Sequence, residues 1–258
     1  MLTQIDHLVI LVRDLEQASE DYEDLGFNVM PGGKHADGLT RNALIPFEDG
    51  SYLELVAFLN PEDKRDNIWG WRSFLGSGVG LLDYCVASDD LEEDVRSFQE
   101  RGLSVSSPED GGRQLPDGTE LRWRIARFEQ SGRVLPFLIE DLTDRTLRVP
   151  NTPATVHPNG SRGVSDLTLA VSDLRASTGL LGSLTNDAKA VPEFGKRHPR
   201  FAVGDQALIL TTPENAEGPI RQRLNAAGDG PFSITLSTYS EDKRLNPPGA
   251  RIFLKPSS

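Results

Sequence analysis

The sequence predicts an α+β fold built from tandem modules, each with the element order strand, helix, strand, strand, strand. The main observation is an internal repeat, in which DHLVILVRDLEQASEDYEDLGFNV is followed later by LDYCVASDDLEEDVRSFQERGLSV. When Asp14 is aligned with Asp90, Gly26 falls on Gly102 without a gap. Self-similarity at this scale indicates a duplicated supersecondary unit, because each copy carries the same succession of structural signals.

Each copy begins with a strand and continues with a helix that an aspartate caps and a glycine ends. An apolar stripe with helical spacing marks the buried side of each helix. It comprises Leu15, Ala18, Tyr22 and Leu25 in the first copy, and Leu91, Val95 and Phe98 in the second. Two strands then flank a turn in each copy, TRNALIPF and SYLELVAF around EDGS, and TELRWRIARF and VLPFLIEDL around EQSGR. We therefore expect βαβββ modules over about residues 4–60 and 80–143.

The second half of the chain repeats the pattern less completely. A third copy, VSDLTLAVSDLRASTGLLGSL, begins at Val164, whereas a fourth is visible as the helix EGPIRQRLNAAG and the strands PFSITLST and ARIFLKP. The segment RVPNTPATVHPNGSRG between the halves is rich in Pro, Asn, Thr and Gly, a composition typical of a linker. The sequence thus predicts a first domain over 1–148, a linker over 149–162 and a degenerate domain over 163–258, with one full and one truncated module.

Composition limits the possible partners and the compartment. The formal net charge of −12 is spread along the chain, which argues against nucleic acid and anionic membranes as partners. No apolar run approaches the roughly 18 residues that cross a bilayer, and the N-terminus lacks the pattern of a signal peptide. A single cysteine, Cys85, fits a reducing environment. We expect a cytoplasmic protein that is a monomer or homodimer and binds a small molecule.

Strand alternation places a histidine toward the interior of the first module. Successive side chains of a strand point to opposite faces, so His7 shares a face with Val9 and Leu11, opposite the more aliphatic set Leu8, Ile10 and Val12. The aliphatic face is expected to pack under the helices, which leaves His7 on the other side. In the hairpin, Tyr52, Glu54 and Val56 share a face in the same way.

The tandem modules and their xDHxxxxVxDL opening resemble the vicinal oxygen chelate superfamily of glyoxalases, extradiol dioxygenases, fosfomycin-modifying enzymes and bleomycin-binding proteins. The run GFNVMPGGKHADGLTRNALIPFEDGSYLEL closely resembles bacterial glyoxalase-like domain proteins, and ELRWRIAR, LPFLIED and HPNGSRGV fit the same group. The resemblance covers essentially the whole chain, most strongly up to about residue 170. It implies the glyoxalase/bleomycin resistance/dioxygenase-like fold, in which paired modules form a half-barrel whose inner wall carries the site.

The resemblance also implies a metal cage with one ligand from each of four strand positions, here His7, Glu54, Asp83 and Glu140. Asp83 departs from the family, which commonly has histidine there. One imidazole with three carboxylates suits Mn²⁺, Fe²⁺ or Mg²⁺, and His7 also allows Zn²⁺ or Ni²⁺. No nucleotide cofactor is expected. In the second half Asp166 takes the His7 position and Leu208 the Glu54 position, so that half lacks the cage and has a structural or lid role.

Simpler structural roles compete with metal binding. Converging carboxylates repel one another, so a cation binds them, or one stays protonated, or Asp83 turns to a backbone amide. Glu140 can instead form an ion pair with Arg122 or Arg124 across the hairpin. A lone histidine such as His7 is often a core residue with satisfied hydrogen bonds.

Further contacts are expected at the mouth of the cavity. His35 follows a Gly-Gly turn and either touches the ligand or lies on the surface, while Asn42 would orient a polar substrate group. Trp123 and Arg124 differ in parity, so only one of them faces the cavity, as an apolar wall or as an anion anchor. Tyr52 is the remaining expected contact. The other two uncertain residues are His157, a linker contact or one that reaches the first barrel, and Cys85, expected as a small buried side chain.

Two functions remain open at this point. The first is a metal-dependent lyase, isomerase or dioxygenase in which a divalent ion chelates two neighbouring oxygens of a small substrate. Glu140 is then the first candidate for the residue that moves the proton, and Glu54 is the second. The second is a metal-free protein that binds a small molecule or drug, holding an aromatic or cationic ligand with Trp123, Tyr52 and Tyr84.

Overall fold

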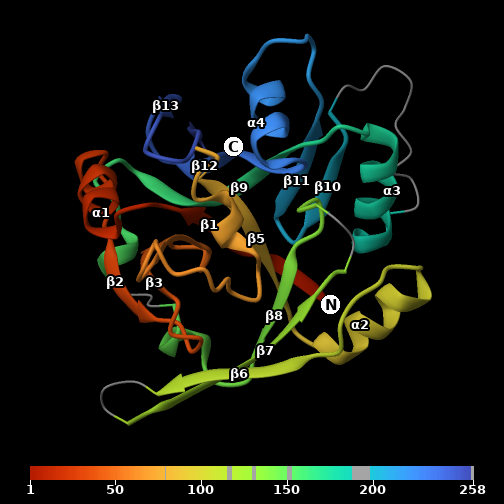
Figure 1. The fold of residues 1–258 in the computed structure, drawn as a ribbon, viewed down its shortest axis with the longest axis horizontal. Coiled ribbons are helices and arrows are strands. Elements are labelled where there is room, and N and C mark those ends of the chain that lie inside the picture. The colour runs from red at the N-terminus through yellow and green to blue at the C-terminus, as the bar shows by residue number, and fades with distance from the viewer. Residues whose placement is uncertain (79, 115–117, 130–131, 150–152, 188–197, 257–258) are drawn as a thin grey trace.

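Two β-sheets organise the chain in the computed structural model (Figure 1). The structure describes residues 1–258 except 79, 115–117, 130–131, 150–152, 188–197 and 257–258. The first sheet has eight strands in the order β2-β3-β4-β1-β5-β8-β7-β6 and curls into a half-barrel, and the second has six in the order β10-β11-β9-β12-β14-β13. The predicted α+β class with tandem modules is confirmed.

The first sheet contains two successive modules. The first comprises β1 (Leu2–Leu11), α1 (Leu15–Asp24), β2 (Met30–Lys34), β3 (Thr40–Pro46) and β4 (Tyr52–Phe58). After a short 3₁₀ helix, η1 (Trp71–Phe74), the second comprises β5 (Leu81–Ser88), α2 (Leu91–Glu100), β6 (Glu109–Gln114), β7 (Glu120–Arg127) and β8 (Phe137–Asp141). Both helices begin as predicted, because Asp14 accepts a hydrogen bond from the Gln17 N–H at 3.1 Å and Asp90 one from the Glu93 N–H at 3.0 Å.

The second half contains the other sheet. It comprises β9 (Ser161–Ala170), α3 (Leu174–Thr185), β10 (Arg200–Val203), β11 (Gln206–Thr211), α4 (Pro219–Ala227), β12 (Gly230–Thr238), β13 (Lys243–Leu245) and β14 (Ile252–Pro256). Two 3₁₀ turns, η2 (Arg145–Leu147) and η3 (Pro153–Thr155), precede it. Strand β12 pairs antiparallel with β9, as β5 does with β1, and parallel with β14, as β5 does with β8. The pairing of the first sheet therefore recurs, but α4 precedes the strand of its module instead of following it.

Both halves bury their apolar faces in one core. The outward face of the first sheet, with Leu8 and Ile10, packs with α1, α2 and the second half in one apolar cluster that includes Leu167, Leu236 and Ile252. The inward face, with Val9 and Leu11, contributes to a separate cluster. The alternation predicted for β1 thus holds, and the second half covers the outside of the half-barrel. No helix in the described part of the chain has the length and apolar character that a bilayer-spanning helix needs.

Strand register corrects one expected equivalence in the second half. Val9 pairs with Glu54 in the first module, and the corresponding partners in the third are Thr168 and Ile209. Leu208, the residue expected at the Glu54 position, is fully buried in the shared core. A shift of one residue reverses the face of a strand, so Ile209 is the register equivalent.

His157 joins the linker to the first module. Its Nδ1 accepts a hydrogen bond from the Asn28 N–H and its Nε2–H donates to the Pro46 carbonyl, both at 2.9 Å. This arrangement needs the neutral ring, and burial lowers the pKa of His157 below its usual value. Of the two roles left open for His157, the structure shows that it reaches the first barrel.

A close approach between the backbones of the two halves occurs at Gly80 and predicts a packing effect. A Cβ at Gly80 would lie 2.3 Å from the Cα of Gly249, whose carbonyl accepts the Leu81 N–H at 2.7 Å. We expect Gly80→Ala to lower the free energy of unfolding by about 1–3 kcal/mol through overpacking. At Gly76 an added Cβ meets nothing within 4 Å, so Gly76→Ala serves as the matched control. Equal urea midpoints for the two variants would contradict the prediction.

The buried His157 predicts a pH dependence of stability. Because its folded pKa lies below its unfolded value, only the unfolded chain takes up this proton as pH falls through about 6.5. The contribution of His157 to the free energy of unfolding should therefore fall over this interval, whereas His35, whose pKa is raised, contributes in the opposite direction. In His157→Gln that part of the fall should be absent, whereas exposed His198→Gln should behave as the wild type. Urea titrations at pH 7.5 and 5.5 measure it, and parallel losses in all three proteins would refute it.

Candidate functional site

A cavity of about 270 Å³ lies on the concave face of the first sheet. Its lining residues in the described part of the chain all fall between positions 7 and 148. The second half lies on the opposite face of this sheet. The expected lid role of the second half is therefore not supported by the described residues.

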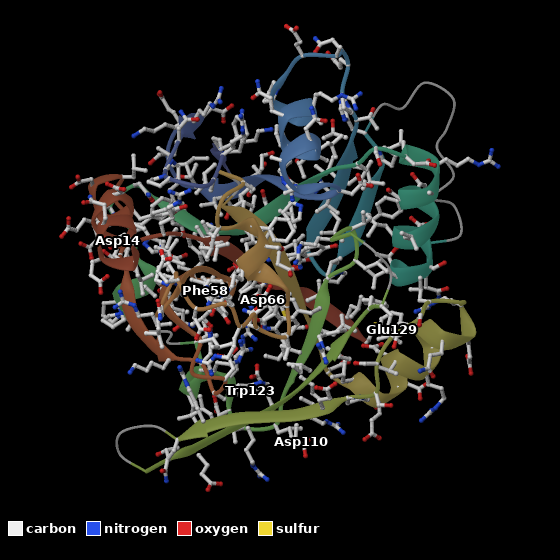
Figure 2. All side chains as sticks on the ribbon, in the orientation of Figure 1. Asp14, Phe58, Asp66, Asp110, Trp123 and Glu129 are labelled. Atoms are coloured by element: carbon white, nitrogen blue, oxygen red, sulfur yellow. The ribbon has the colours of Figure 1, made fainter. Side chains whose placement is uncertain are left out.

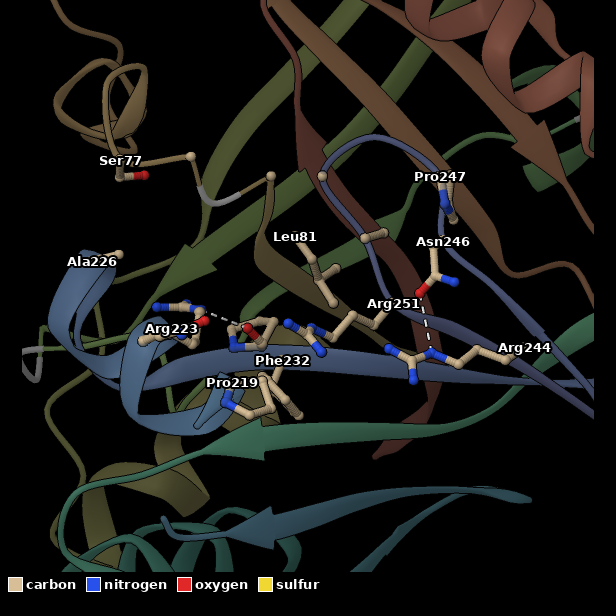
Figure 3. Close-up of a pocket in the computed structure, with 16 residues that line it drawn as sticks. Ser77, Leu81, Pro219, Arg223, Ala226, Phe232, Arg244, Asn246, Pro247 and Arg251 are labelled. Carbon is tan, nitrogen blue, oxygen red and sulfur yellow. Dashed lines mark hydrogen bonds between the residues drawn. The ribbon is translucent and has the colours of Figure 1, made fainter. Parts of the chain in front are cut away.

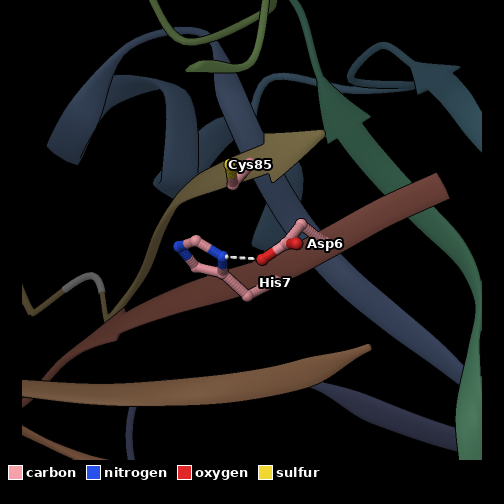
Figure 4. A group of neighbouring side chains, drawn as sticks. All are labelled: Asp6, His7 and Cys85. Atoms are coloured by element: carbon pink, nitrogen blue, oxygen red, sulfur yellow. Dashed lines mark hydrogen bonds and ion pairs between the residues drawn. The ribbon is translucent and has the colours of Figure 1, made fainter. Parts of the chain in front are cut away.

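A β-bulge brings two neighbouring side chains of β1 together. Ile5 pairs with Val86 and His7 with Cys85, so Asp6 is an extra residue opposite the regular β5 strand. Asp6 Oδ1 lies 2.6 Å from Nδ1 of His7 (Figure 4). We infer that the ionised Asp6 accepts a hydrogen bond from Nδ1–H, so that Nε2 of His7 faces Glu54 on the cavity side.

The carboxylate of Asp6 is fully buried and is held by two arginines. Arg148 donates to both of its oxygens, at 3.0 and 2.8 Å, and Arg145 also donates to it. Burial alone would raise the pKa of Asp6, but these guanidinium groups and His7 hold it well below its usual value. Arg148 also contacts both oxygens of Asp141 at 2.7 Å. The segment after β8 thereby fixes the β1 bulge.

Glu54 is the second polar group at the floor of the cavity. Its Oε2 lies 3.5 Å from Nε2 of His7 and its Oε1 lies 3.1 Å from Nε2 of His35. Asn42 donates to the same Oε1 through Nδ2, and its own Oδ1 accepts the Gly33 N–H at 2.8 Å, which sets the orientation of the amide. Burial opposes ionisation, yet His35, His7 and Asn42 lower the pKa of Glu54 to about 2.

His35 comes from the turn after β2 and is the more accessible imidazole. Its Nδ1 lies 2.6 Å from the hydroxyl of Thr40, which leaves Nε2 facing Glu54. Desolvation lowers the pKa of His35, but the hydrogen bond and charge of Glu54 outweigh it and raise the pKa. The structure therefore places His7, Glu54, His35, Asn42 and Tyr52 around one cavity.

Glu140 and Arg124 do not enter the cavity, and this corrects the expected ligand set. Arg124 donates to Glu140 at 3.0 and 2.7 Å and to Glu92 of α2 at 2.6 Å, all on the outer face of the sheet. Trp123, of opposite parity, lines the cavity instead. Figure 2 shows it on the side of β7 that faces the rest of the first half. Glu140 thus has the structural ion pair named as its alternative.

Strand register explains why Glu140 is displaced. Val9 pairs with Glu54 in the first module, and the corresponding residue of the second, Cys85, pairs with Phe137. Phe137 therefore takes the Glu54 position and lies edge-on to His7, with ring centroids 5.3 Å apart. An odd offset along a strand exchanges its faces. The second module thus contributes an apolar side chain where a carboxylate was expected.

Asp83 also lies outside the cavity lining. Its carboxylate accepts the indole N–H of Trp71 at 3.0 Å, the Tyr84 N–H at 3.0 Å and a hydrogen bond from Arg133. Burial raises its pKa, although Arg133 and Trp71 act in the opposite direction. Asp83 therefore holds the Trp71 ring in position from outside the cavity. Its contact with the Tyr84 N–H is the turn toward a backbone amide that was one of the alternatives expected for Asp83. The same strand carries Tyr84, which is fully buried and donates its hydroxyl to a backbone carbonyl.

The apolar wall includes all three tryptophans of the chain, Trp69, Trp71 and Trp123. Trp69 stacks on Trp71 with centroids 5.7 Å apart and lies 4.4 Å from the Phe137 ring. A Cβ at Gly111 would lie 2.4 Å from the Trp123 indole nitrogen, so the glycine lets this ring cross β6. The sequence reasoning missed Trp69 and Trp71, although two tryptophans in the short segment NIWGW were an available signal.

Cationic side chains occupy other parts of the wall. Lys34 and Arg113 line the cavity near His35, and Arg148 reaches the Tyr52 hydroxyl at 3.1 Å. These three residues, like Asp6, were not predicted. Arg148 is already paired with Asp6 and Asp141, and Asp37 and Glu54 line the same cavity, so the lining carries charges of both signs.

The donor groups that face the cavity are of the types that bind divalent metals. Asp6, His7 and Cys85 bring possible ligand atoms within 4.8 Å of one another, but Asp6 is already paired with arginines and burial raises the pKa of the Cys85 thiol. The better donors are His7 Nε2, His35 Nε2 and the ionised Glu54. Two imidazoles and a carboxylate are typical of Fe(II) and also accept Zn²⁺. The hydrogen bond of Asp6 to the other nitrogen of His7 is the usual support of a ligating histidine.

Comparison with solved structures shows the fold. A hypothetical protein from Staphylococcus aureus is similar over 100% of both chains, with 15% identity and a TM-score of 0.72. A mutant of 4-hydroxymandelate synthase from Streptomyces coelicolor is similar over 92% of this chain and 71% of its own, with 16% identity and a TM-score of 0.62. A xylose isomerase-like TIM barrel/4-hydroxyphenylpyruvate dioxygenase fusion protein is similar over 93% of this chain and 37% of its own, with 15% identity and a TM-score of 0.55.

Sequence comparison identifies the family. No curated protein matches the chain. The family model described as a glyoxalase-like domain matches residues 5–185, which include both modules of the first sheet and the opening of the second half. The chain therefore belongs to the glyoxalase-like domain family.

Proposed function

We propose that the cavity is the active site of a metal-dependent enzyme that acts on a small oxygenated molecule. The observation that carries the proposal is the convergence of His7 Nε2 and His35 Nε2 on the ionised Glu54, with 3.5 and 3.1 Å to its two oxygens. These three residues would hold a divalent ion. When bound, the ion would polarise two neighbouring substrate oxygens. The ligand set favours Fe(II), and hence the dioxygenase type over the lyase or isomerase type.

The residues around this donor set prepare it for binding. Asp6 fixes the proton of His7 on Nδ1, and Asn42 holds one oxygen of Glu54 in place. A Glu54 pKa of about 2 makes this carboxylate a poor base at neutral pH. Its role is therefore to bind a cation, and the proton transfer that was expected of Glu54 and Glu140 is not part of the proposal.

The shape and charge of the cavity indicate the substrate class. A volume of about 270 Å³ with an aromatic wall suits one planar ring. Trp69, Trp123 and Phe137 would contact its faces and exclude water, while Lys34 and Arg113 would attract a carboxylate or phenolate. We therefore propose a small aromatic acid, or a phenol with neighbouring oxygens, as the substrate.

One observation favours a binding protein as the second candidate. The second module places Phe137 and Ile139 on the cavity wall and contributes none of the three proposed ligands His7, His35 and Glu54. A metal-free protein that sequesters an aromatic anion would need only the wall and the cations. The two candidates differ in whether ligand binding requires a metal.

Metal binding by variants of two glutamates tests the first candidate. We expect the wild type, loaded anaerobically with Fe²⁺ and desalted, to retain one ion per chain, and Glu54→Gln to lose at least 100-fold in affinity because it removes the carboxylate ligand. Glu140→Gln is the matched control, since Glu140 lies on the outer face with Arg124. Elemental analysis and calorimetric titration with Fe²⁺, Mn²⁺, Zn²⁺ and Ni²⁺ measure the effect.

Tryptophan fluorescence separates the two candidates, because all three tryptophans line the cavity. Quenching by catechol or benzoate that depends on added metal would support the enzyme. The same quenching without metal, in a protein that retains none of the four ions, would favour the binding protein and overturn the first candidate.

The buried partner of His7 gives a further prediction. Asp6→Asn should lower the free energy of unfolding by about 3–5 kcal/mol, because it leaves Arg148 buried without its main counter-charge. Asp166→Asn is the matched control, since the partner of Asp166 is the half-exposed Arg200 and such a pair contributes at most about 1 kcal/mol. Urea unfolding measures both, and ¹⁵N NMR of the imidazoles reports whether the His7 proton stays on Nδ1. Similar losses in both variants would contradict the role of the Asp6 network.

A further inference from the structure

A second cavity, of about 460 Å³, lies where the two halves meet (Figure 3). One face of α4, with Gln222 and Arg223, forms one wall, and the β13–β14 segment, with Arg244 and Arg251, forms another. Leu81 at the start of β5 also lines it. No residue of this lining belongs to the lining of the aromatic cavity, so the two sites are separate.

The lining of this second cavity is cationic, although the formal net charge of the chain is −12. Its described lining residues include three arginines and no aspartate or glutamate. Arg244 donates through Nε to Asn246 at 3.1 Å, and the Arg251 guanidinium lies 5.2 Å from the centre of the Phe232 ring. Within the described ranges, neither group forms an ion pair with a carboxylate. Both are therefore available to an anion.

Arg223 adds a buried positive charge to the same wall. It is only 6% exposed and donates to the carbonyls of Pro231 and Gly228, each at 2.9 Å, while its Nη2 is buried without a hydrogen-bond partner. The nearby carboxylate of Asp229 is engaged by the N–H and hydroxyl of Ser172. A buried charge is costly unless a counter-charge compensates it. In the described part of the chain no carboxylate pairs with Arg223.

We propose that this cavity is a binding site for a small organic anion with at least two negative charges, such as a phosphate ester or a polycarboxylate. Guanidinium groups bind both chemistries through paired N–H donors. Arg244 and Arg251 would contact the anion directly, and Arg223 would supply the inner positive charge. The volume is in the range of sites for small organic molecules, so an organic body would lie beside Phe232 and Leu81.

Binding at this site would also strengthen the contact between the halves. Leu81 donates its N–H to Gly249 at 2.7 Å, and both residues line the cavity. A ligand that bridges β5 and the β13–β14 segment binds the folded chain only, so it raises the unfolding temperature by mass action. The proposal is independent of the metal site in the first half.

Titration with simple anions tests the proposal on the full-length chain. Citrate, pyrophosphate and inorganic phosphate are compared with acetate and chloride at equal ionic strength, by calorimetry and thermal unfolding. We expect citrate or pyrophosphate to bind and to raise the unfolding temperature, with acetate and chloride without effect. Preference for pyrophosphate or for citrate distinguishes the phosphate ester from the polycarboxylate.

Matched arginine variants locate the site. Arg251→Gln and Arg244→Gln should each weaken binding at least tenfold while folding as the wild type, because neither arginine forms an ion pair with a described carboxylate. Arg96→Gln, an exposed arginine on α2 that pairs with Glu93, should bind as the wild type, and so should Glu54→Gln in the other cavity. Absence of binding by every multivalent anion, or equal affinities in all four variants, would overturn the proposal.

Discussion

The pairing of the buried Asp6 with Arg148 and Arg145 is the interaction on which the site depends. A carboxylate without exposure would stay protonated unless cations faced it, and here two guanidinium groups from the segment after β8 keep it charged. That charge orients His7, and Asp141 binds the same arginines from β8. Strands β1 and β8, which lie on either side of β5, are therefore connected through one buried network, and the polar floor of the cavity depends on it.

The two modules of the first sheet contribute different kinds of side chains to the cavity. Residues of the first module supply the polar donors, His7, Glu54 and His35, whereas the second supplies Phe137 and Trp123 to the wall. Duplication alone would produce a symmetric cage. The substitution of Phe137 at the position that corresponds to Glu54 breaks this symmetry. An aromatic ring beside His7 also lowers the local dielectric constant, which strengthens the charge interactions of the donors.

The sequence predicted the modules, the helix caps and the inward face of β1 and β4, because long strands with one aliphatic face show their alternation clearly. It misplaced Glu140, since β8 is short and follows a loop, and an odd error in register exchanges the two faces of a strand. Asp6 was missed for a related reason: a bulge interrupts alternation and leaves no periodic signal. Trp69 and Arg148 lie outside the regular strands, where tertiary packing alone determines what they contact.

The second half repeats the strand pairing of the first but lacks the buried network of Asp6, Arg145 and Arg148. Asp166, at the His7 position, pairs with the half-exposed Arg200, and Ile209 corresponds to Glu54. Among the described residues of this half no imidazole is held at that position, and the apolar residues of this sheet instead join the core beneath the first sheet. Covering that face leaves the cations near α4 and β14 at the junction of the halves, where three arginines line one cavity. The position of these arginines at the junction thus follows from the packing of the two sheets.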